Sequence, residues 1–277
     1  MINEIFSNQY IFIIILMVPT AAIAGFFAGL FGIGGGLITV PFLFFIFHNL
    51  NINPDYLMHL AVGTSFSIII PTSAISVLTH RKHKAVDINI VKKYGVFVII
   101  GVLSGTVFAA FLKTKSLLLF FTVIVYLLGS YLLNLKDKTN KIRKNFNLTP
   151  RIIFGFISGF ISAPMGIAGA IMNVPILRYF GYPIKKAIGS AAAIGFIIAL
   201  FGAIGFLITG SFLKSDLPLS IGFINIPAFL IFIPITMFMA RVGASTVHKI
   251  DKDKVQKFFG IFLYVVGTVF LYRYLNT

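Results

Sequence analysis

The sequence predicts an all-α polytopic membrane protein made of two inverted repeats. Each repeat is expected to hold a helical hairpin broken by glycine residues, followed by three transmembrane helices. Three observations carry this prediction. The chain is strongly apolar, a glycine-rich motif occurs twice, and Lys and Arg residues gather in alternate loops.

The composition is typical of a protein that lies almost wholly within a bilayer. Of the 277 residues, 58% are hydrophobic and only 11% are charged, and the mean hydropathy is +0.99. A soluble domain carries about 25% charged residues. Apolar runs of membrane-spanning length recur along the whole chain. We therefore expect one multi-pass bundle in the plasma (inner) membrane, with the lipid bilayer as its main surroundings.

Several classes of function are excluded or disfavoured by the same composition. The net charge of +16 arises from Lys and Arg in short loops, which is typical of a cytoplasmic membrane face, so no nucleic-acid partner is expected. The chain has no cysteine, which excludes disulfides and thiolate metal sites. Neither metal-ligand spacing of histidines nor a catalytic arrangement is visible at membrane depth. We expect no enzyme activity, no cofactor and no metal.

The glycine-rich motif marks an internal repeat. Residues 32–41 read GIGGGLITVP and residues 166–175 read GIAGAIMNVP, with five of ten positions identical. Further matches follow in the same order: AVGTS (61–65) with AIGSA (187–191), and Ile88-Asn89-Ile90 with Ile224-Asn225-Ile226.

These matches predict three parts of the chain. They are a first transmembrane repeat over 1–135, a basic cytoplasmic linker over 136–151, and a second transmembrane repeat over 152–277.

The distribution of positive charge favours inverted halves. If each glycine-rich region belonged to a single span, the two sides of the membrane would hold 13 and 10 Lys and Arg residues. If each region is the tip of a hairpin that returns to its own side, the split becomes 19 to 4. The second split agrees with the positive-inside rule. It places both termini outside.

The two hairpin tips form the predicted site. A backbone break inside a bilayer is tolerated only where protein or a water-filled cavity covers it. Paired breaks in inverted halves indicate the binding site of a transporter, and the N–H groups at the start of the following helix favour an anion. Glycine also lets a ligand approach the main chain closely. All seven acidic residues fall in loops or near span ends, which argues against a carboxylate-bound cation.

The candidate substrate contacts are glycines of the two breaks and neutral polar residues nearby. They are Gly34, Gly35, Gly36, Thr39, Thr64, Ser65, Gly166, Gly169, Asn173 and Ser190. Each polar member could instead make a hydrogen bond between helices. Glycines at small-xxx-small spacing are interpreted as packing positions: Gly25 and Gly29, Gly101 and Gly105, and Gly155 and Gly159.

The chain resembles the sulfite exporter TauE/SafE family of membrane proteins. The resemblance rests on GFFAGLFGIGGGLITVPFL (25–43), GFISGFISAPMGIAGAIMNVPIL (155–177), and the AVGTS and AIGSA segments. It implies a small transporter of sulfur-containing anions such as sulfite, or of organosulfonates, with a small anion as its partner. The second motif departs from the family pattern because it holds fewer glycines.

Two other functions remain open at this point: a passive channel for anions or small solutes, and a membrane scaffold that transports nothing. The doubled breaks argue against a scaffold, which needs none. The sequence does not fix an oligomeric state.

Overall fold

The computed structural model describes residues 8–31, 34–134, 146–213, 217–246 and 252–276. In the first half the helices are α2 (Asn8–Phe31), α3 (Gly36–Asn49), η1 (Pro54–Tyr56), α4 (Leu57–Lys82), α5 (Ile88–Ala110) and α6 (Thr114–Asn134). In the second half they are α7 (Leu148–Met165), α8 (Ala170–Tyr179), α9 (Ile184–Phe212), α10 (Ile226–Thr246) and α11 (Lys252–Asn276). Two short antiparallel strands, β1 (Ser220–Ile221) and β2 (Ile224–Asn225), pair just before α10.

The prediction of an all-α polytopic membrane protein is confirmed. Among the described residues, seven helices are long and apolar enough to cross a membrane. The others include the short helix α3, with 14 residues, and α8, with 10. At 1.5 Å per residue these extend about 21 Å and 15 Å, which is less than the hydrocarbon thickness.

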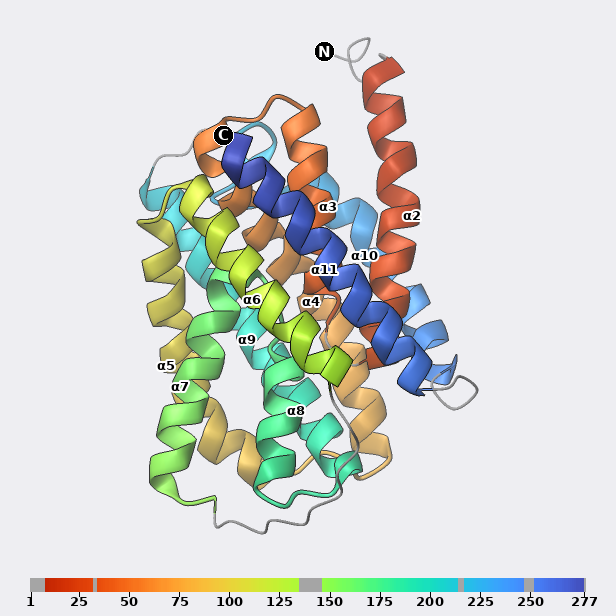
Figure 1. Cartoon of the computed structure of the whole chain (residues 1–277), viewed down its shortest axis with the longest axis vertical. Coiled ribbons are helices and arrows are strands. Elements are labelled where there is room, and N and C mark those ends of the chain that lie inside the picture. Colours follow the sequence, from red (N-terminus) through yellow and green to blue (C-terminus); the bar gives the residue numbers. More distant parts are fainter. Residues whose placement is uncertain (1–7, 32–33, 135–145, 214–216, 247–251, 277) are drawn as a thin grey trace.

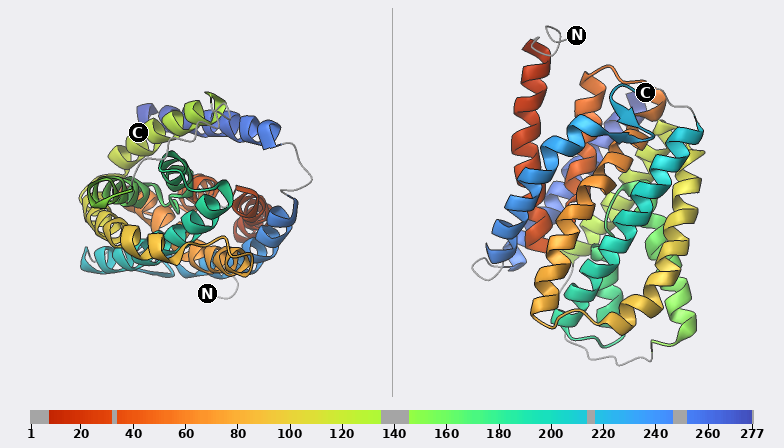
Figure 2. Two further views of the ribbon diagram at one scale, coloured as in Figure 1. Left: turned by 90° about the horizontal axis from the view of Figure 1, so that it is seen from below. Right: turned by 180° about the vertical axis from the view of Figure 1, so that it is seen from behind.

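The two hairpins open toward opposite ends of the bundle (Figure 1). The α2–α3 hairpin begins and ends at the end where the described chain starts and finishes, and the α7–α8 hairpin begins and ends at the other. Seen from below, α6 and α11 lie together along one side of the bundle (Figure 2). Much of the predicted linker lies outside the described residues, and α7 already begins at Leu148, within the 136–151 stretch.

Helices α4 and α9 form the centre. The most apolar 18-residue window of each is 67% and 61% buried, against 28–44% for the other five spans. They contact each other, and α3 and α8 pack on them from the two hairpins. The centre of the bundle therefore meets both hairpin tips.

Small residues let helices of different halves approach closely. Helix α5 packs on α7, and α2 packs on α10. A methyl group added to Gly101 would lie 2.2 Å from the Phe156 carbonyl oxygen, and one added to Gly29 would lie 2.0 Å from that of Ala240. The packing interpretation of the small-xxx-small pairs is confirmed, because these contacts leave no room for a side chain.

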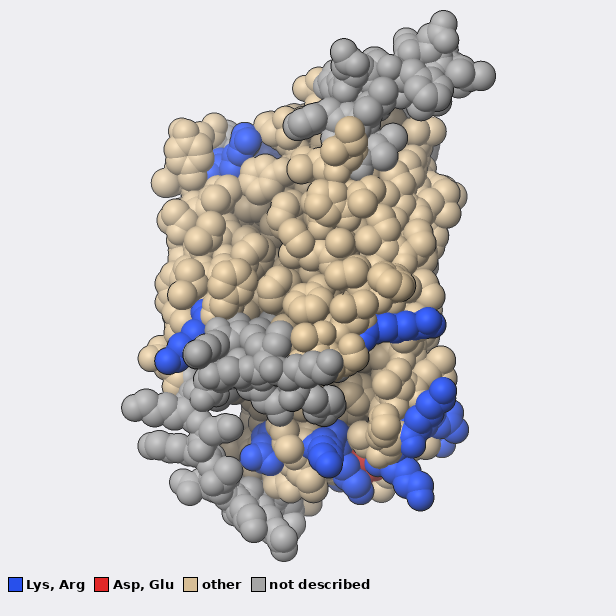
Figure 3. Space-filling view, turned by 90° about the vertical axis from the view of Figure 1, so that its right-hand side faces the viewer, with Lys and Arg blue, Asp and Glu red and all other residues tan. Residues whose placement is uncertain are grey.

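Positive charge gathers at one end of the bundle. The end of α4, the starts of α5, α7 and α9, and the end of α8 meet there, and the space-filling view shows most Lys and Arg toward that end (Figure 3). A smaller group lies near the opposite end.

We expect Gly29→Ala to destabilise the bundle, because its methyl group would meet rigid backbone of α10. Overpacking of this kind costs about 1–3 kcal/mol. Gly95→Ala is the matched control, since its methyl group meets only the end of the Ile197 side chain, at 3.1 Å. The measurement is thermal unfolding in detergent. A Gly29→Ala protein as stable as Gly95→Ala would contradict the close packing of α2 on α10.

Candidate functional site

Left-handed glycines produce both helix breaks. Gly35 and Gly169 directly precede α3 and α8, with φ of 79° and 64°. Residues that carry a side chain rarely adopt this left-handed backbone region, whereas glycine adopts it without a steric penalty. Each carbonyl accepts two N–H groups of the following turn, from Ile38 and Thr39 in α3 and from Met172 and Asn173 in α8.

The second motif keeps glycine at the two positions where α7 ends and α8 begins. Gly166 caps the end of α7 with φ of 64°, and its N–H donates to the Ala163 carbonyl at 3.3 Å. Ala168 stands where the first motif has Gly34, whose φ is 72°. The second break thus keeps glycine where φ is positive, and Ala168 lies at a position where it is not.

The two tips are in contact. A methyl group on Gly36 would lie 2.2 Å from the Gly166 carbonyl oxygen, and one on Gly34 would lie 2.7 Å from Cβ of Ala168. The Ser65 hydroxyl donates to the Gly166 carbonyl at 3.0 Å, which joins α4 to the second tip. The structure therefore brings together Gly34, Gly36, Ser65 and Gly166.

In the part of the chain that the structure describes, both helix starts have N–H groups without an acceptor. Neither α3 nor α8 has a side-chain cap at its N-terminus. Gly36 and Leu37 in α3, and Ala170 and Ile171 in α8, donate no N–H to another described backbone group. Such groups carry partial positive charge and suit an anion.

Thr39 and Asn173 follow the breaks at matching places, but their surroundings differ. The Thr39 hydroxyl donates only to the Gly35 carbonyl of its own turn, at 3.1 Å. Asn173 is fully buried, and its amide nitrogen donates to the Gly169 carbonyl at 2.9 Å. Its amide oxygen accepts hydrogen bonds from Tyr94, at 2.8 Å, and from Ser158, at 2.9 Å.

Thr64 and Ser190 make hydrogen bonds away from the breaks. The Thr64 hydroxyl accepts the backbone N–H of Asn225 at 2.9 Å, and the Ser190 hydroxyl accepts that of Asp87 at 2.9 Å. Asn225 and Asp87 are the residues directly before α10 and α5, and their side chains accept N–H groups of those first turns. These two hydroxyls hold equivalent loops against α4 and α9.

These caps correct the alignment of one repeat segment. The tripeptides at 88–90 and 224–226 were matched, yet α5 begins at Ile88 and α10 begins at Ile226. The capping residues Asp87 and Asn225 are equivalent, so the tripeptide match is wrong by two residues. The two tripeptides are identical in sequence, but they lie at different positions relative to the first residue of the following helix.

Three polar residues near the second break were missed in the sequence analysis. Tyr94 and Ser158 donate hydrogen bonds to Asn173, and the buried Ser162 hydroxyl has no hydrogen-bond partner among the described residues. The four-residue spacing of Ser158 and Ser162 on the helix before the break is the signal that could have indicated a polar face toward it.

No described carboxylate lies at the breaks. Asp55 belongs to η1 and Asp87 caps the start of α5, both near ends of the bundle. Among the described residues, no three His, Asp or Glu side chains are placed to share a metal ion.

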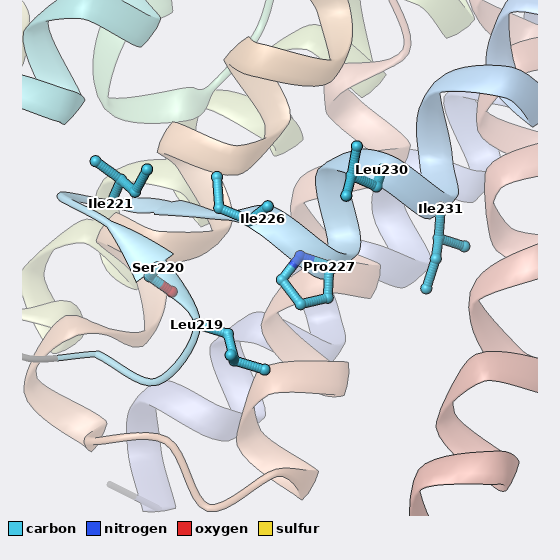
Figure 4. A pocket seen from close by; sticks show the side chains of 7 residues that line it. All are labelled: Leu219, Ser220, Ile221, Ile226, Pro227, Leu230 and Ile231. Atoms are coloured by element: carbon cyan, nitrogen blue, oxygen red, sulfur yellow. The ribbon is translucent and has the colours of Figure 1, made fainter. Parts of the chain in front are cut away.

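An open apolar groove of about 660 Å³ lies at the β1–β2 turn and the start of α10 (Figure 4). Its lining residues are Leu219, Ser220, Ile221, Ile226, Pro227, Leu230 and Ile231. It includes none of the predicted contacts, and a single hydroxyl among apolar side chains offers little to an anion. The breaks remain the better candidate site.

Comparison with known proteins gives a consistent result. The sequence profile described as "Sulfite exporter TauE/SafE" matches residues 17–270. A probable membrane transporter protein of Haemophilus influenzae is 33% identical over 255 residues, which cover 92% of this chain and 96% of that protein. Probable membrane transporter proteins of Methanocaldococcus jannaschii and Bacillus subtilis are 28% and 26% identical, and cover 93% and 94% of this chain and 96% and 97% of their own. No solved structure matches. The chain therefore belongs to the TauE/SafE family of membrane transporters.

Proposed function

We propose that this transporter carries small anions, sulfur-containing oxyanions or organosulfonates, and binds them at the paired helix breaks. The observation that carries the proposal is the contact of two left-handed glycine breaks whose following helices begin with unfilled N–H groups. The family description, which names sulfite export, supports the choice of anion.

The energetics require several donors. Transfer of a bare anion into hydrocarbon costs tens of kcal/mol by Born estimates. Each helix N-terminus contributes up to about 2 kcal/mol when partly buried. Direct hydrogen bonds to a charged group contribute about 1.5–3 kcal/mol each, so the N–H groups of both helices and retained water are needed together. Neutral donors of this kind bind the anion without an opposite charge that would hold it too tightly for release.

The proposal includes an orientation. Because the Lys- and Arg-rich end of the bundle fits the cytoplasmic face, both termini lie outside and the hairpins enter from opposite sides of an inner membrane. The matching order of elements in the two halves supports inverted repeats over 1–135 and 152–277. A negative interior favours outward movement of a monoanion by about 2.3 kcal/mol per 100 mV, which makes export feasible.

Cysteine labelling tests the orientation, since the chain has no native cysteine. Lys113→Cys lies in the exposed α5–α6 loop and should react with an impermeant maleimide added to intact cells. His83→Cys, which is exposed directly after α4, should react only after the membrane is permeabilised. The unsubstituted protein is the control and should not react. The reverse pattern would overturn the proposed orientation.

Gly35→Val should abolish anion flux while the protein still inserts. Valine is strained at a φ of 79°, and its Cβ would lie 3.0 Å from the Ala24 carbonyl oxygen. The measurement is initial flux of sulfite, thiosulfate and sulfate into proteoliposomes at equal reconstituted amounts, with Gly95→Ala as control. Wild-type flux should saturate with concentration, as a channel's would not. Normal flux in Gly35→Val would remove the first break from the transport site.

A further inference from the structure

We propose that the second break alone holds an oxyanion subsite, in which the Ser162 hydroxyl binds the anion beside the N-terminus of α8. This inference rests on the proposed function and narrows its site to one of the two breaks. It starts from an observation independent of the helix start, namely a buried hydroxyl without a partner.

Ser162 is fully buried on α7, and its hydroxyl makes no hydrogen bond in the described structure. Other buried hydroxyls near the breaks, those of Thr39, Ser65 and Ser158, all have partners. Leaving a buried hydroxyl unpaired is unfavourable, so a ligand that accepts its hydrogen bond would be bound favourably.

The Ser162 hydroxyl faces the start of α8. A methyl group built on Gly169 would lie 2.8 Å from Ser162 Oγ and 3.2 Å from the Asn173 amide nitrogen, and 2.6 Å from Cδ1 of Ile198, which closes the apolar side of this point. Gly169 is the residue directly before α8, whose first N–H groups have no acceptor among the described backbone. The hydroxyl, the amide and the helix start therefore converge on one point.

A hydrogen-bond network fixes the Asn173 amide in the orientation that an anion needs. Tyr94 and Ser158 both donate to its oxygen, which turns the nitrogen toward Gly169. The nitrogen carries two hydrogens, and the Gly169 carbonyl takes one. The second hydrogen is a further donor for an oxyanion, and Tyr94 and Ser158 act as positioning residues.

The first break also has a left-handed glycine directly before its second helix, but its lining is apolar. The last residues of α2 and α7 are 134 positions apart in the sequence, and so are the first residues of α3 and α8. At this offset Ala28 matches Ser162 and Ala24 matches Ser158. A methyl group on Gly35 would meet Cβ of Ala28 at 3.2 Å, as one on Gly169 meets the Ser162 hydroxyl. The hydroxyls are thus present at one break only.

The ligand class follows from these donors. All are neutral N–H or O–H groups, and they lie around one buried point. A small oxyanion with several acceptor oxygens fits them better than a cation, which would need acceptors, or an apolar solute, which would leave them unpaired. Since Ser162 lies against Gly169, binding requires the α8 tip to move away from α7.

The test compares Ser162→Ala with wild type in proteoliposomes and in detergent. Sulfite, thiosulfate and sulfate are the probes, and Thr122→Val, which removes a buried hydroxyl bonded within α6, is the control. We expect the KM of Ser162→Ala for the transported anion to rise about tenfold, or 1.4 kcal/mol, with little change in maximal rate. Thr122→Val should keep the wild-type KM.

Thermal unfolding separates binding from structure. Without anion, Ser162→Ala should be as stable as wild type or more so, because it loses only an unpaired hydroxyl. The rise in Tm that saturating anion gives wild type should shrink in the variant.

Unchanged KM and unchanged anion-induced stabilisation in Ser162→Ala would overturn this inference while leaving anion transport intact. A wild-type protein that neither transports nor is stabilised by these anions would overturn the proposed function itself.

Discussion

The need to satisfy a broken backbone inside an apolar bundle shapes the rest of this structure. Three carbonyl groups of the two breaks have internal partners. Gly35 and Gly169 accept from their own helices, and Gly166 accepts from Ser65. The first N–H groups of α3 and α8 donate to no backbone carbonyl among the described residues. Free N–H groups at a helix start carry partial positive charge, which is why we propose an anion as the ligand.

Glycine performs two different tasks in this chain, and the local pattern separates them. Single glycines four residues apart bring α2 onto α10 and α5 onto α7, where backbone atoms meet. Glycines in close succession provide positive φ at the breaks, as at Gly34 and Gly35. Gly36 belongs with the packing glycines, because it is the helical first residue of α3 and contacts Gly166 of the other tip.

The fold could be predicted from the sequence because hydropathy and a repeated motif are local signals. The glycines of both breaks were found in the same way. The hydrogen-bond partners of Thr64 and Ser190 could not be predicted, because the direction of a hydroxyl on a helix depends on which loop packs beside it, here those before α10 and α5. Tyr94 was missed because it lies 79 residues from Asn173, and no local pattern reports a hydrogen bond across that separation.

The contact between the tips gives a physical reason for their chemical difference. Two anions bound about 4 Å apart would repel each other by about 4 kcal/mol at an effective dielectric constant of 20. If the two breaks, which are in contact, held equal subsites, binding of a second anion would therefore be opposed by this repulsion. The first break has Ala24 and Ala28 where the second has Ser158 and Ser162, which is why we propose the second break as the anion subsite. In this proposal the hydroxyl and amide donors come from the second break, and the first break adds the close backbone contact and the N-terminal N–H groups of α3.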